Sequence, residues 1–266
     1  MKVERNLDKI CEAFDEEASR RSLRGVLGVA AFDSFHDALL PVQKELLEGI
    51  CGARFIELLE GGSVISIAYA YPDNAIDSLA LKKGDGFDKD RWNEYARWYR
   101  NLNDALNETA EALAKETSGI AVPATVSWTA DVKHVEDFYK MAVSHRVAAE
   151  QAGVGWRGKN ELVINPIYGC AIRLASVVTD APVERTHASY EGCGSCRSCL
   201  DACPFLGQKE KLENYREQCW RYINALGLEA EVCGKCIKAC ANSPTFKEIR
   251  SKGEPSNIRS IHYTSK

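Results

Sequence analysis

Eight of the eleven cysteines in this 266-residue chain lie between Cys193 and Cys240, at spacings that suit metal–thiolate chemistry. The first run, Cys-x2-Cys-x2-Cys-x3-Cys-Pro, contains Cys193, Cys196, Cys199 and Cys203, and the second run contains Cys219, Cys233, Cys236 and Cys240. In the bacterial ferredoxin run, three thiolates hold one [4Fe–4S] cluster and the fourth crosses to the other cluster. The pattern therefore predicts a first cluster set of Cys193, Cys196, Cys199 and Cys240. It predicts a second cluster set of Cys203, Cys219, Cys233 and Cys236.

Two other uses of these cysteines fit less well. Zinc also binds CxxC pairs, but it needs neither three cysteines at x2, x2 spacing nor a crossing Cys-Pro. Disulfides belong to secreted proteins, and nothing at the start of this chain indicates secretion. The remaining cysteines, Cys11, Cys51 and Cys170, lie in apolar-periodic segments, where we expect buried small hydrophobic side chains.

Just before the cysteine runs, Gly153, Gly155 and Gly158 form a literal GxGxxG motif. A dinucleotide site needs a strand before such a motif and a helix after it. Here a helix-like segment precedes the motif and a strand-like segment follows it, so the nicotinamide reading fails. Two readings stay open: a tight helix-to-strand turn, and a bend that lets the backbone approach a large ligand while cations meet its polar periphery.

The bulk composition describes a globular protein without membrane segments. A net charge of −4 and a pI near 5.8 argue against a nucleic-acid surface, which usually carries a basic stripe. No signal peptide and no run of 18 apolar residues occur. We therefore expect a cytoplasmic protein with no membrane contact.

The elements that must position these residues follow from hydrophobic periodicity. The periodicity predicts helices over 3–21, 38–50, 91–117 and 134–152. It predicts strands over 25–32, 63–72, 120–128, 161–166 and 170–180, with a loop over 73–90. This alternation indicates a layered α/β or α+β domain over 1–185. Cysteine-spaced turns follow over 186–245, and 246–266 reads as a loosely ordered C-terminal tail.

Three sequence segments, in this order, resemble the epoxyqueuosine reductase family. They are AEQAGVGWRGKNELVINPIYG, LASVVTDAPVE and CGSCRSCLDACP. The family carries a similar AGxGWxGKN segment, a YG-containing strand, a TD-containing strand end and a double-cubane module. The resemblance covers about 140–241 and extends to the wider superfamily, which includes respiratory reductive dehalogenases.

The resemblance implies an α+β protein. A nitroreductase-like α/β sandwich domain that binds cobalamin would precede a small ferredoxin-like domain with two [4Fe–4S] clusters. In such enzymes the clusters deliver electrons to cobalt, and the protein supplies orientation and a proton. By position, the resemblance places six residues at the corrinoid: Gly155, Trp156, Gly158, Lys159 and Asn160, with Tyr168 nearby.

The chain departs from the family pattern in two respects. The family's catalytic aspartate lies about fourteen residues before the AG of the motif, where this chain has Tyr139. We consider Tyr139 and His145 as proton donors and Arg146 as a partner for an anionic group, although each also suits a partly buried helix face. In addition, tRNA-handling members continue into a helical-repeat domain, whereas this chain stops soon after its last cysteine. With the acidic charge balance, this favours a small-molecule substrate over tRNA.

Three functional hypotheses follow. The first is a cobalamin-dependent reductase that receives electrons from ferredoxin or flavodoxin. The second is an electron-transfer or corrinoid-activating protein that has no catalytic cofactor of its own. The third is a flavin enzyme, with FMN in the nitroreductase-like domain. They differ in the organic cofactor, which is a corrinoid, none or FMN, beside the iron–sulfur clusters.

Overall fold

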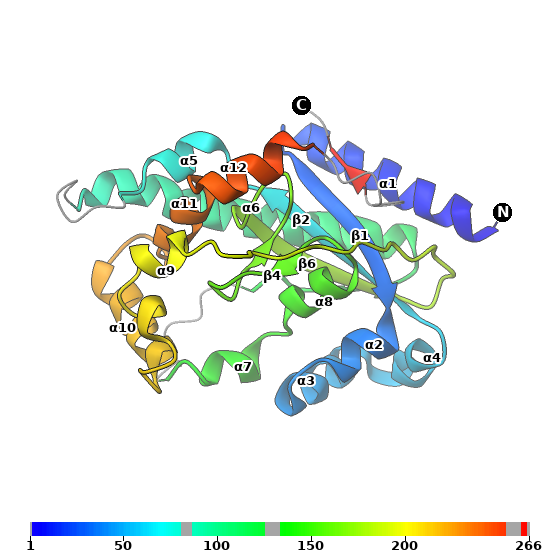
Figure 1. Cartoon of the computed structure of the whole chain (residues 1–266). Coiled ribbons are helices and arrows are strands. Elements are labelled where there is room, and N and C mark those ends of the chain that lie inside the picture. The colour runs from blue at the N-terminus through cyan, green and yellow to red at the C-terminus, as the bar shows by residue number, and fades with distance from the viewer. Residues whose placement is uncertain (1, 81–86, 126–133, 254–261, 265–266) are drawn as a thin grey trace.

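A five-stranded antiparallel sheet organises the computed structural model, which describes residues 2–80, 87–125, 134–253 and 262–264 (Figure 1). The strand order is β3-β6-β2-β1-β7. These strands are β1 (Gly25–Ala31), β2 (Ser63–Ala70), β3 (Ile120–Val122), β6 (Ile172–Thr179) and β7 (His262–Tyr263). A separate two-stranded ribbon pairs β4 (Trp156–Arg157) with β5 (Val163–Ile164). Helices combined with an antiparallel sheet confirm the predicted α+β class.

Helices cover both faces of the sheet (Figure 1). One core contains residues of α1 (Lys2–Arg20) and α6 (Lys89–Glu116) together with Leu27 and Ile65. The other core contains Val26 and Val64 together with residues of the shorter helices. These are α2 (Phe32–Asp37), α3 (Pro41–Cys51), α4 (Phe55–Leu59), which follows a short 3-10 turn η1 (Gly52–Arg54), and α8 (His145–Gln151). Neighbouring residues of a strand point to opposite faces of the sheet. Because helices cover both faces, every residue of β1 and β2 is buried.

Helix α6 confirms the clearest periodicity in the sequence. Asp88 caps its start, because the Asp88 side chain accepts a hydrogen bond of 3.1 Å from the Arg91 backbone N–H. The helix buries an aromatic face that includes Trp92, Tyr95 and Tyr99. Among the described residues, no helix combines the length and apolar content needed to cross a bilayer.

The helix predicted over 134–152 is wrong as one element. The structure has two short helices, α7 (Asp137–Met141) and α8, joined by an extended link at Ala142 with φ −144° and ψ 136°. The Ala142 carbonyl accepts a 3.1 Å hydrogen bond from Gln43 of α3, and Val143 is buried in the second core. Long-range packing therefore overrides a helical pattern that is continuous in the sequence.

Other boundaries also differ from prediction. The segment 38–50 is helical only from Pro41, whose fixed φ suits a first helical turn. The predicted loop over 73–90 contains α5 (Asp73–Asp77), and 81–86 lie outside the described residues. The strand predicted over 120–128 ends at Val122, because 123–125 are not in a strand, and 126–128 lie outside the described residues.

The cysteine-bearing segment folds as short helices. They lie at one end of the helix-covered sheet, next to α5 and the start of α6 (Figure 1). These helices are α9 (Ser198–Ala202), η2 (Leu206–Gln208), α10 (Tyr215–Leu226) and α11 (Lys235–Ala241). The Lys238 ammonium donates to the Leu79 carbonyl, and Asn93 of α6 accepts a 2.9 Å hydrogen bond from the Glu229 backbone N–H. A Cβ at Gly234 would lie 2.1 Å from a Leu79 methyl carbon, so this contact is closely packed.

Residues from two segments that were predicted to lie outside the first domain contact its strand β1. Just after the predicted boundary at 185, the Thr186 backbone N–H donates to the Val29 carbonyl at 2.9 Å. The predicted tail over 246–266 contains most of α12 (Pro244–Ser251) and all of β7, which pairs Tyr263 with Val26 of β1. Residues 254–261 of that tail lie outside the described part.

Replacing Ile65→Ala should lower the free energy of unfolding by about 2–5 kcal/mol, because a fully buried side chain on β2 would leave a cavity. Urea unfolding monitored by far-UV circular dichroism would measure the change. Ile56→Ala is the matched control, since Ile56 is 60% exposed and its loss should change stability by less than about 0.5 kcal/mol. Equal effects of the two substitutions would contradict the assigned core.

Candidate functional site

Cysteines of both predicted cluster sets lie near one another in the structure. Burial, followed by the charges of the other three members of the first set, raises the pKa of Cys199 to about 11. Burial and the other three members of the second set raise the pKa of Cys236 well above its ordinary value. Cys199 and Cys236 thus each have the three others of their predicted set as electrostatic neighbours, and Cys236 has Cys199 of the first set as well.

Four thiols in each predicted set match the number of cysteine ligands that a [4Fe–4S] cluster takes. No three His, Cys, Asp or Glu side chains among the described residues lie close enough together to hold a single metal ion. A [4Fe–4S] cluster needs a different arrangement, with four thiolates placed around a cube. Gly192 and Gly194, with φ of +77° and +48°, let the loop curl around Cys193 in a conformation that other residues rarely adopt. The donor set and the loop therefore fit a cubane.

The two sets occupy different environments. Cys203, Cys219 and Cys236 of the second set line a cavity of about 350 Å³. No member of the first set lines it. The loop that carries the first set is instead open to solvent, because Gly194 and Arg197 on it are exposed. The second set therefore lies at the cavity, whereas the first set lies away from it, with Cys199 and Cys240 buried and exposed residues on the loop beside them.

The cavity lies between the cysteine-bearing segment and the rest of the protein. On one side are residues of α10 and η2, including Tyr215, Trp220 and Leu206. On the other side are α7 and the turn that follows the GxGxxG motif, including Phe138 and Leu162. An apolar and aromatic wall with a few polar groups is typical of ligand sites.

Three polar atoms of cavity-lining residues are buried without a hydrogen-bond partner among the described residues. They are Arg146 Nε, Trp220 Nε1 and Glu231 Oε2. Burial also raises the pKa of the Glu231 carboxyl. Since unpaired buried polar groups are costly, two donors and one acceptor remain available to a ligand that carries both kinds of group, such as a carboxamide.

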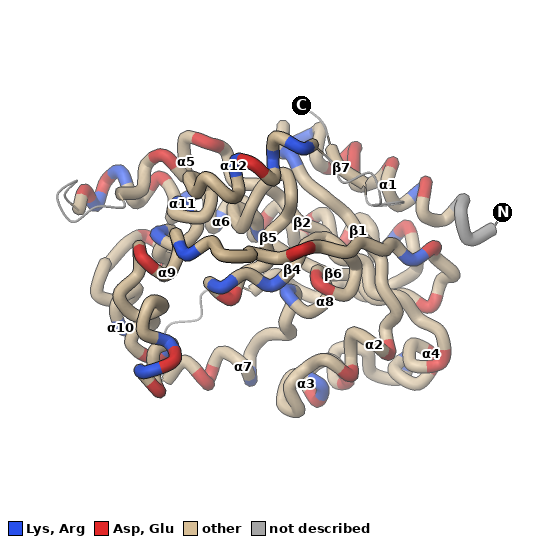
Figure 2. The backbone as a smooth tube through the Cα atoms, viewed as in Figure 1, with Lys and Arg blue, Asp and Glu red and all other residues tan. Residues whose placement is uncertain are grey.

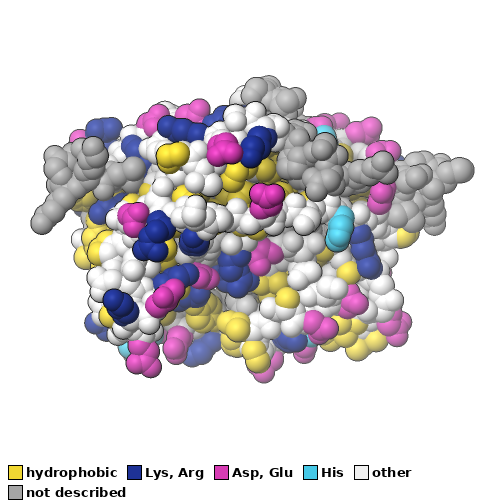
Figure 3. Space-filling model, in the orientation of Figure 1, with side chains coloured by type: hydrophobic (Ala, Val, Ile, Leu, Met, Phe, Trp, Pro, Cys, Tyr) yellow, Lys and Arg dark blue, Asp and Glu magenta, His cyan; other side chains and the backbone are white. Residues whose placement is uncertain are grey.

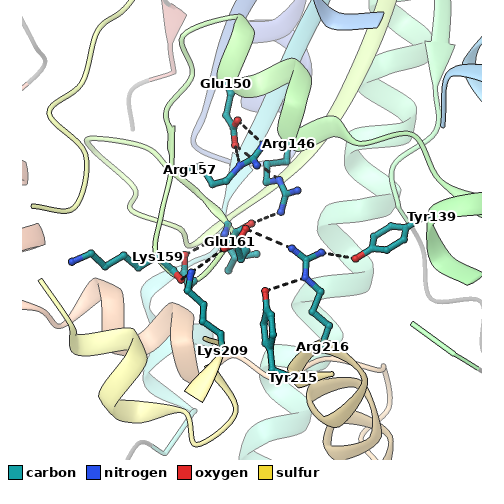
Figure 4. A network of polar contacts seen from close by, with 11 residues as sticks. Tyr139, Arg146, Glu150, Arg157, Lys159, Glu161, Lys209, Tyr215 and Arg216 are labelled. Carbon is teal, nitrogen blue, oxygen red and sulfur yellow. Dashed lines mark hydrogen bonds and ion pairs between the residues drawn. The ribbon is translucent and has the colours of Figure 1, made fainter. Parts of the chain in front are cut away.

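A polar network surrounds the mouth of the cavity (Figure 4). The Arg216 guanidinium donates to the Tyr139 hydroxyl, and its Nε donates to the Tyr215 hydroxyl at 3.0 Å. Its Nη2 lies 3.6 Å from Glu161 Oε2, and Lys209 Nζ donates to Glu161 Oε1 at 3.0 Å. Glu161 thus joins cations from the cysteine-bearing segment to the turn after β4.

Cations outnumber carboxylates in this network. Its cations are Arg146, Arg157, Lys159, Lys209 and Arg216, and its carboxylates are Glu150 and Glu161. Figure 2 shows several Lys and Arg positions along β4 and the start of α8, and Figure 3 shows dark-blue side chains gathered on this face. Burial, followed by the charge of Arg157, lowers the pKa of Arg146. The network around Glu161 therefore carries an excess of positive charge, whereas the charged residues that line the cavity itself, Arg146, Arg216, Glu161 and Glu231, balance.

Two of the three predicted catalytic residues reach the cavity. Tyr139 lines it from α7, and its hydroxyl accepts the Arg216 hydrogen bond, which leaves the phenolic proton free to be donated. Arg146 lines it from α8, while its Nη1 donates to the Glu161 carbonyl at 2.6 Å.

His145 does not line the cavity, and both of its ring nitrogens are engaged elsewhere. Nε2 lies 2.7 Å from the Pro123 carbonyl, which only accepts, so Nε2 carries the proton and Nδ1 accepts from Ser176 Oγ at 3.0 Å. Burial is the main cause that lowers its pKa to about 4. The structure therefore gives His145 a buried structural position.

Of the six residues predicted at the corrinoid, only Asn160 lines the cavity. A Cβ at Gly155 would lie 2.3 Å from the Ile164 carbonyl oxygen, and one at Gly158 would lie 2.5 Å from an Ile164 methyl carbon. These two glycines therefore allow β4 and β5 to pack closely.

The other three motif residues are also engaged away from the cavity. Lys159 Nζ donates to the carbonyls of Gly194 and Cys196 at 2.7 and 2.9 Å, in the loop that carries the first set. The Trp156 ring lies 5.0 Å from that of Tyr190. Tyr168 donates to the Gly25 carbonyl at 3.4 Å, at the edge of the sheet.

Sequence reasoning missed the cavity residues of α10 and its approaches, namely Lys209, Tyr215, Arg216, Trp220 and Glu231. The signal was present in YREQCWRY, where aromatic and basic residues flank Cys219 at helical spacing. The same reasoning missed Glu161, whose role depends on cations that are distant in sequence.

Comparisons with known proteins find epoxyqueuosine reductases. The chain is 35% identical over 147 residues to the enzyme of Listeria monocytogenes, covering 54% of this chain and 35% of the relative. It is 28% identical over 186 residues to that of Escherichia coli, covering 69% and 45%. The matches thus span less than half the length of these relatives. No protein-family model matches the chain.

Two of the solved structures that resemble the chain are also epoxyqueuosine reductases, with lower sequence identity than these relatives. An epoxyqueuosine reductase from Streptococcus thermophilus matches with 21% identity and a TM-score of 0.47, covering 93% of this chain and 68% of that one. A second, crystallised with an epoxyqueuosine-modified tRNA-Tyr stem loop, matches with 23% identity and a TM-score of 0.48, covering 91% and 66%. The resemblance to epoxyqueuosine reductases that the motifs predict is confirmed by the sequence relatives.

The expectation that tRNA is not a partner is contradicted. The relatives are named for epoxyqueuosine, and one matched structure holds a tRNA stem loop that carries it. The net charge of −4 averages over the whole chain and does not report the local excess of cations around Glu161.

The buried His145 should make stability depend on pH between about 4 and 6.5. The lowered pKa means that the unfolded state binds a proton first, so stability is present above pH 6.5 and is lost as the pH falls toward 4. Between pH 7 and pH 5 this loss should be about 2 kcal/mol. Urea unfolding of the wild type and of His145→Gln at both pH values measures it, and equal losses would contradict it.

Proposed function

We propose that the protein is an iron–sulfur oxidoreductase of the epoxyqueuosine reductase type. In this proposal the two cysteine sets hold two [4Fe–4S] clusters that relay single electrons to a substrate site in the cavity. The observation that carries the proposal is the position of Cys203, Cys219 and Cys236 on the cavity wall. The similarity to named epoxyqueuosine reductases supports the reaction class.

The proposed path of electrons is directional. The first set lies in a solvent-open loop, which suits docking of a small donor protein such as ferredoxin or flavodoxin. The second set is at the cavity. Electrons would therefore enter at the first cluster and leave from the second, which is the only one of the two with cysteines on the cavity wall.

The proposed domain plan keeps a nitroreductase-like sandwich and a ferredoxin-like segment over 186–245. Support comes from the sheet covered by helices on both faces and from the short helices that carry the cysteines. Because Thr186 and β7 both contact β1, the sandwich would include the start of the second predicted domain and part of the tail.

We propose that the cavity receives a corrinoid. When bound, this group would supply a cobalt centre that accepts single electrons and reacts with the substrate. The unpartnered Arg146 Nε, Trp220 Nε1 and Glu231 Oε2 would hydrogen-bond its amide-bearing periphery. A volume of about 350 Å³ matches part of such a ligand and not the whole, so the remainder would extend through the mouth.

Tyr139 is the proposed proton donor to the substrate. Its hydroxyl accepts from Arg216, so its own proton can point into the cavity. The same hydrogen bond fixes the position of the Tyr139 hydroxyl at the cavity wall. Tyr139 would thus take the part that the family gives to an aspartate.

The proposed substrate is an epoxyqueuosine-type nucleoside in an anionic strand. The names of the relatives support the nucleoside. The cations at the mouth support the strand, because Lys and Arg bind phosphate groups. Arg157 of this group is held by Glu150 through two hydrogen bonds of 2.9 Å, which fixes its position.

A second function is favoured by the volume of the cavity. About 350 Å³ is small for a corrinoid, which suits an electron-transfer or corrinoid-activating protein with no catalytic cofactor of its own. FMN is the third hypothesis and is closer to the cavity in size. Anaerobic isolation separates the three, since it yields a corrinoid spectrum, iron without an organic cofactor, or FMN released on denaturation.

The cluster assignment predicts the outcome of Cys236→Ala. The iron content after anaerobic reconstitution should fall from about eight to about four per chain, because the second set loses a ligand while the first set is intact. Cys51→Ala is the matched control, being a buried cysteine outside both sets, and should retain about eight. An unchanged iron content in Cys236→Ala would refute the assignment.

The corrinoid proposal predicts the outcome of a cobalamin titration. Added cobalamin should change its visible spectrum on binding to the anaerobic protein, and Arg146→Gln should weaken binding about tenfold by removing a charged donor at the wall. Arg20→Gln, on an exposed arginine, should leave binding unchanged. If the wild type produced no spectral change, the corrinoid proposal would be withdrawn and the second function favoured.

A further inference from the structure

Glu161 adopts a backbone conformation that glutamate rarely takes. It ends the tight turn between β4 and β5, where its backbone N–H donates to the Gly158 carbonyl at 2.9 Å and the Gly158 N–H donates to the Leu162 carbonyl at 2.8 Å. The φ of Glu161 is +64°, in the left-handed region. Short hairpin loops usually place glycine at such a position, because a residue with a Cβ is strained there. Local turn chemistry therefore does not explain the glutamate.

The contacts of Glu161 reach both arginines that line the cavity. Its carbonyl accepts a 2.6 Å hydrogen bond from Arg146 Nη1. Its carboxylate lies 3.6 Å from Arg216 Nη2 and accepts a 3.0 Å hydrogen bond from Lys209 Nζ. Among the described residues, no other arginine and no lysine lines the cavity. One strained residue thus contacts both guanidinium groups of the cavity wall, one through its backbone and the other through its side chain.

Arg216 connects Glu161 to Tyr139 (Figure 4). Its guanidinium donates to the Tyr139 hydroxyl, and its Nε donates to the Tyr215 hydroxyl at 3.0 Å. The Arg216 side chain is 39% exposed. A long, partly exposed arginine loses rotamer freedom when it is held in one orientation, and an ion pair with a carboxylate in a fixed position offsets that loss.

We propose that Glu161 is a positioning residue that holds Arg216, and through it the Tyr139 hydroxyl, at the cavity wall. The inference rests on the proposed role of Tyr139 as proton donor and adds the residue that fixes its orientation. Strained backbone conformations persist where the surrounding structure holds them, and they concentrate at functional sites. Glycine at position 161 would relieve the strain but would leave Arg216 without its carboxylate. The turn therefore keeps a glutamate although it costs stability.

The order of stability of two variants tests the strain. In ordinary helical backbone, glycine is less stable than alanine, whereas in the left-handed region alanine is the strained residue. Urea unfolding of the full-length protein should therefore give Glu161→Gly a folding equilibrium constant about fivefold larger than that of Glu161→Ala. Glu111 is the matched control, because it is an exposed glutamate in α6, and there the order of the two variants should be reversed.

Fluorine NMR of the full-length protein labelled with 3-fluorotyrosine tests the positioning. The chain has ten tyrosines, and Tyr139→Phe identifies the Tyr139 resonance. In Glu161→Gln, which retains the shape of the side chain without its charge, this resonance should shift because Arg216 loses its ion pair. Arg216→Gln should shift it as well. Adding Glu161→Gln to Arg216→Gln should then produce little further shift, because Glu161 acts through Arg216.

Two further variants separate positioning from a general loss of structure. Glu161→Asp retains a carboxylate, so its Tyr139 resonance should lie nearer the wild-type position than that of Glu161→Gln. Glu108→Gln removes a glutamate that pairs with Arg21 on the α1 side of the protein, and it should leave the Tyr139 resonance unchanged.

Three results would overturn the inference. They are an unchanged Tyr139 resonance in Glu161→Gln, a further shift of equal size in the Arg216→Gln background, and a Glu161→Gly variant that is no more stable than Glu161→Ala. Failure of the proposed function would appear separately, as a wild type that assembles no clusters on anaerobic reconstitution. The two failures are therefore distinguishable.

Discussion

The packing of the cysteine-bearing segment against α5 and α6 is the contact on which the site depends. The segment has short helices and exposed turns, so it cannot build a large core of its own. Lys238 and the Glu229 backbone anchor it to Leu79 and Asn93, and Gly234 allows a close approach. This docking sets the second cluster set against the cavity, because the opposite wall belongs to the sandwich.

Electrostatics complete the same interface. Glu161 is bound by Lys209 and approached by Arg216, both from the docked segment, so one carboxylate links the two walls of the cavity. These charges lower the pKa of Glu161 although burial opposes them. The ion pairs of Glu161 thus hold the cysteine-bearing segment against the turn after β4. The cations of this network outnumber its carboxylates, which suits an anionic ligand.

The sequence predicts the parts of the protein that depend on local pattern. Periodicity anticipates α1, α6 and the central strands, whereas the division of the cysteines into two cluster sets stays a prediction from their spacing. It does not anticipate the break at Ala142, because that break depends on Gln43 and on burial of Val143. For the same reason Arg216 was missed: its partners Tyr139 and Glu161 are distant in sequence, and only the folded chain brings them together.

The GKN part of the glycine motif illustrates how one segment connects all of these features. Lys159 holds the loop of the first set, Asn160 donates a hydrogen bond to the sulfur of the buried Cys170, and Glu161 binds Lys209 beside the cavity. Three consecutive side chains therefore contact the loop of the first set, the buried Cys170 thiol and the rim of the cavity. A substitution in this turn would disturb the clusters and the cavity together, even though only Asn160 and Glu161 line the cavity. The contacts of the motif therefore indicate that it connects the loop of the first set to the cavity wall, and they do not indicate that it binds a cofactor directly.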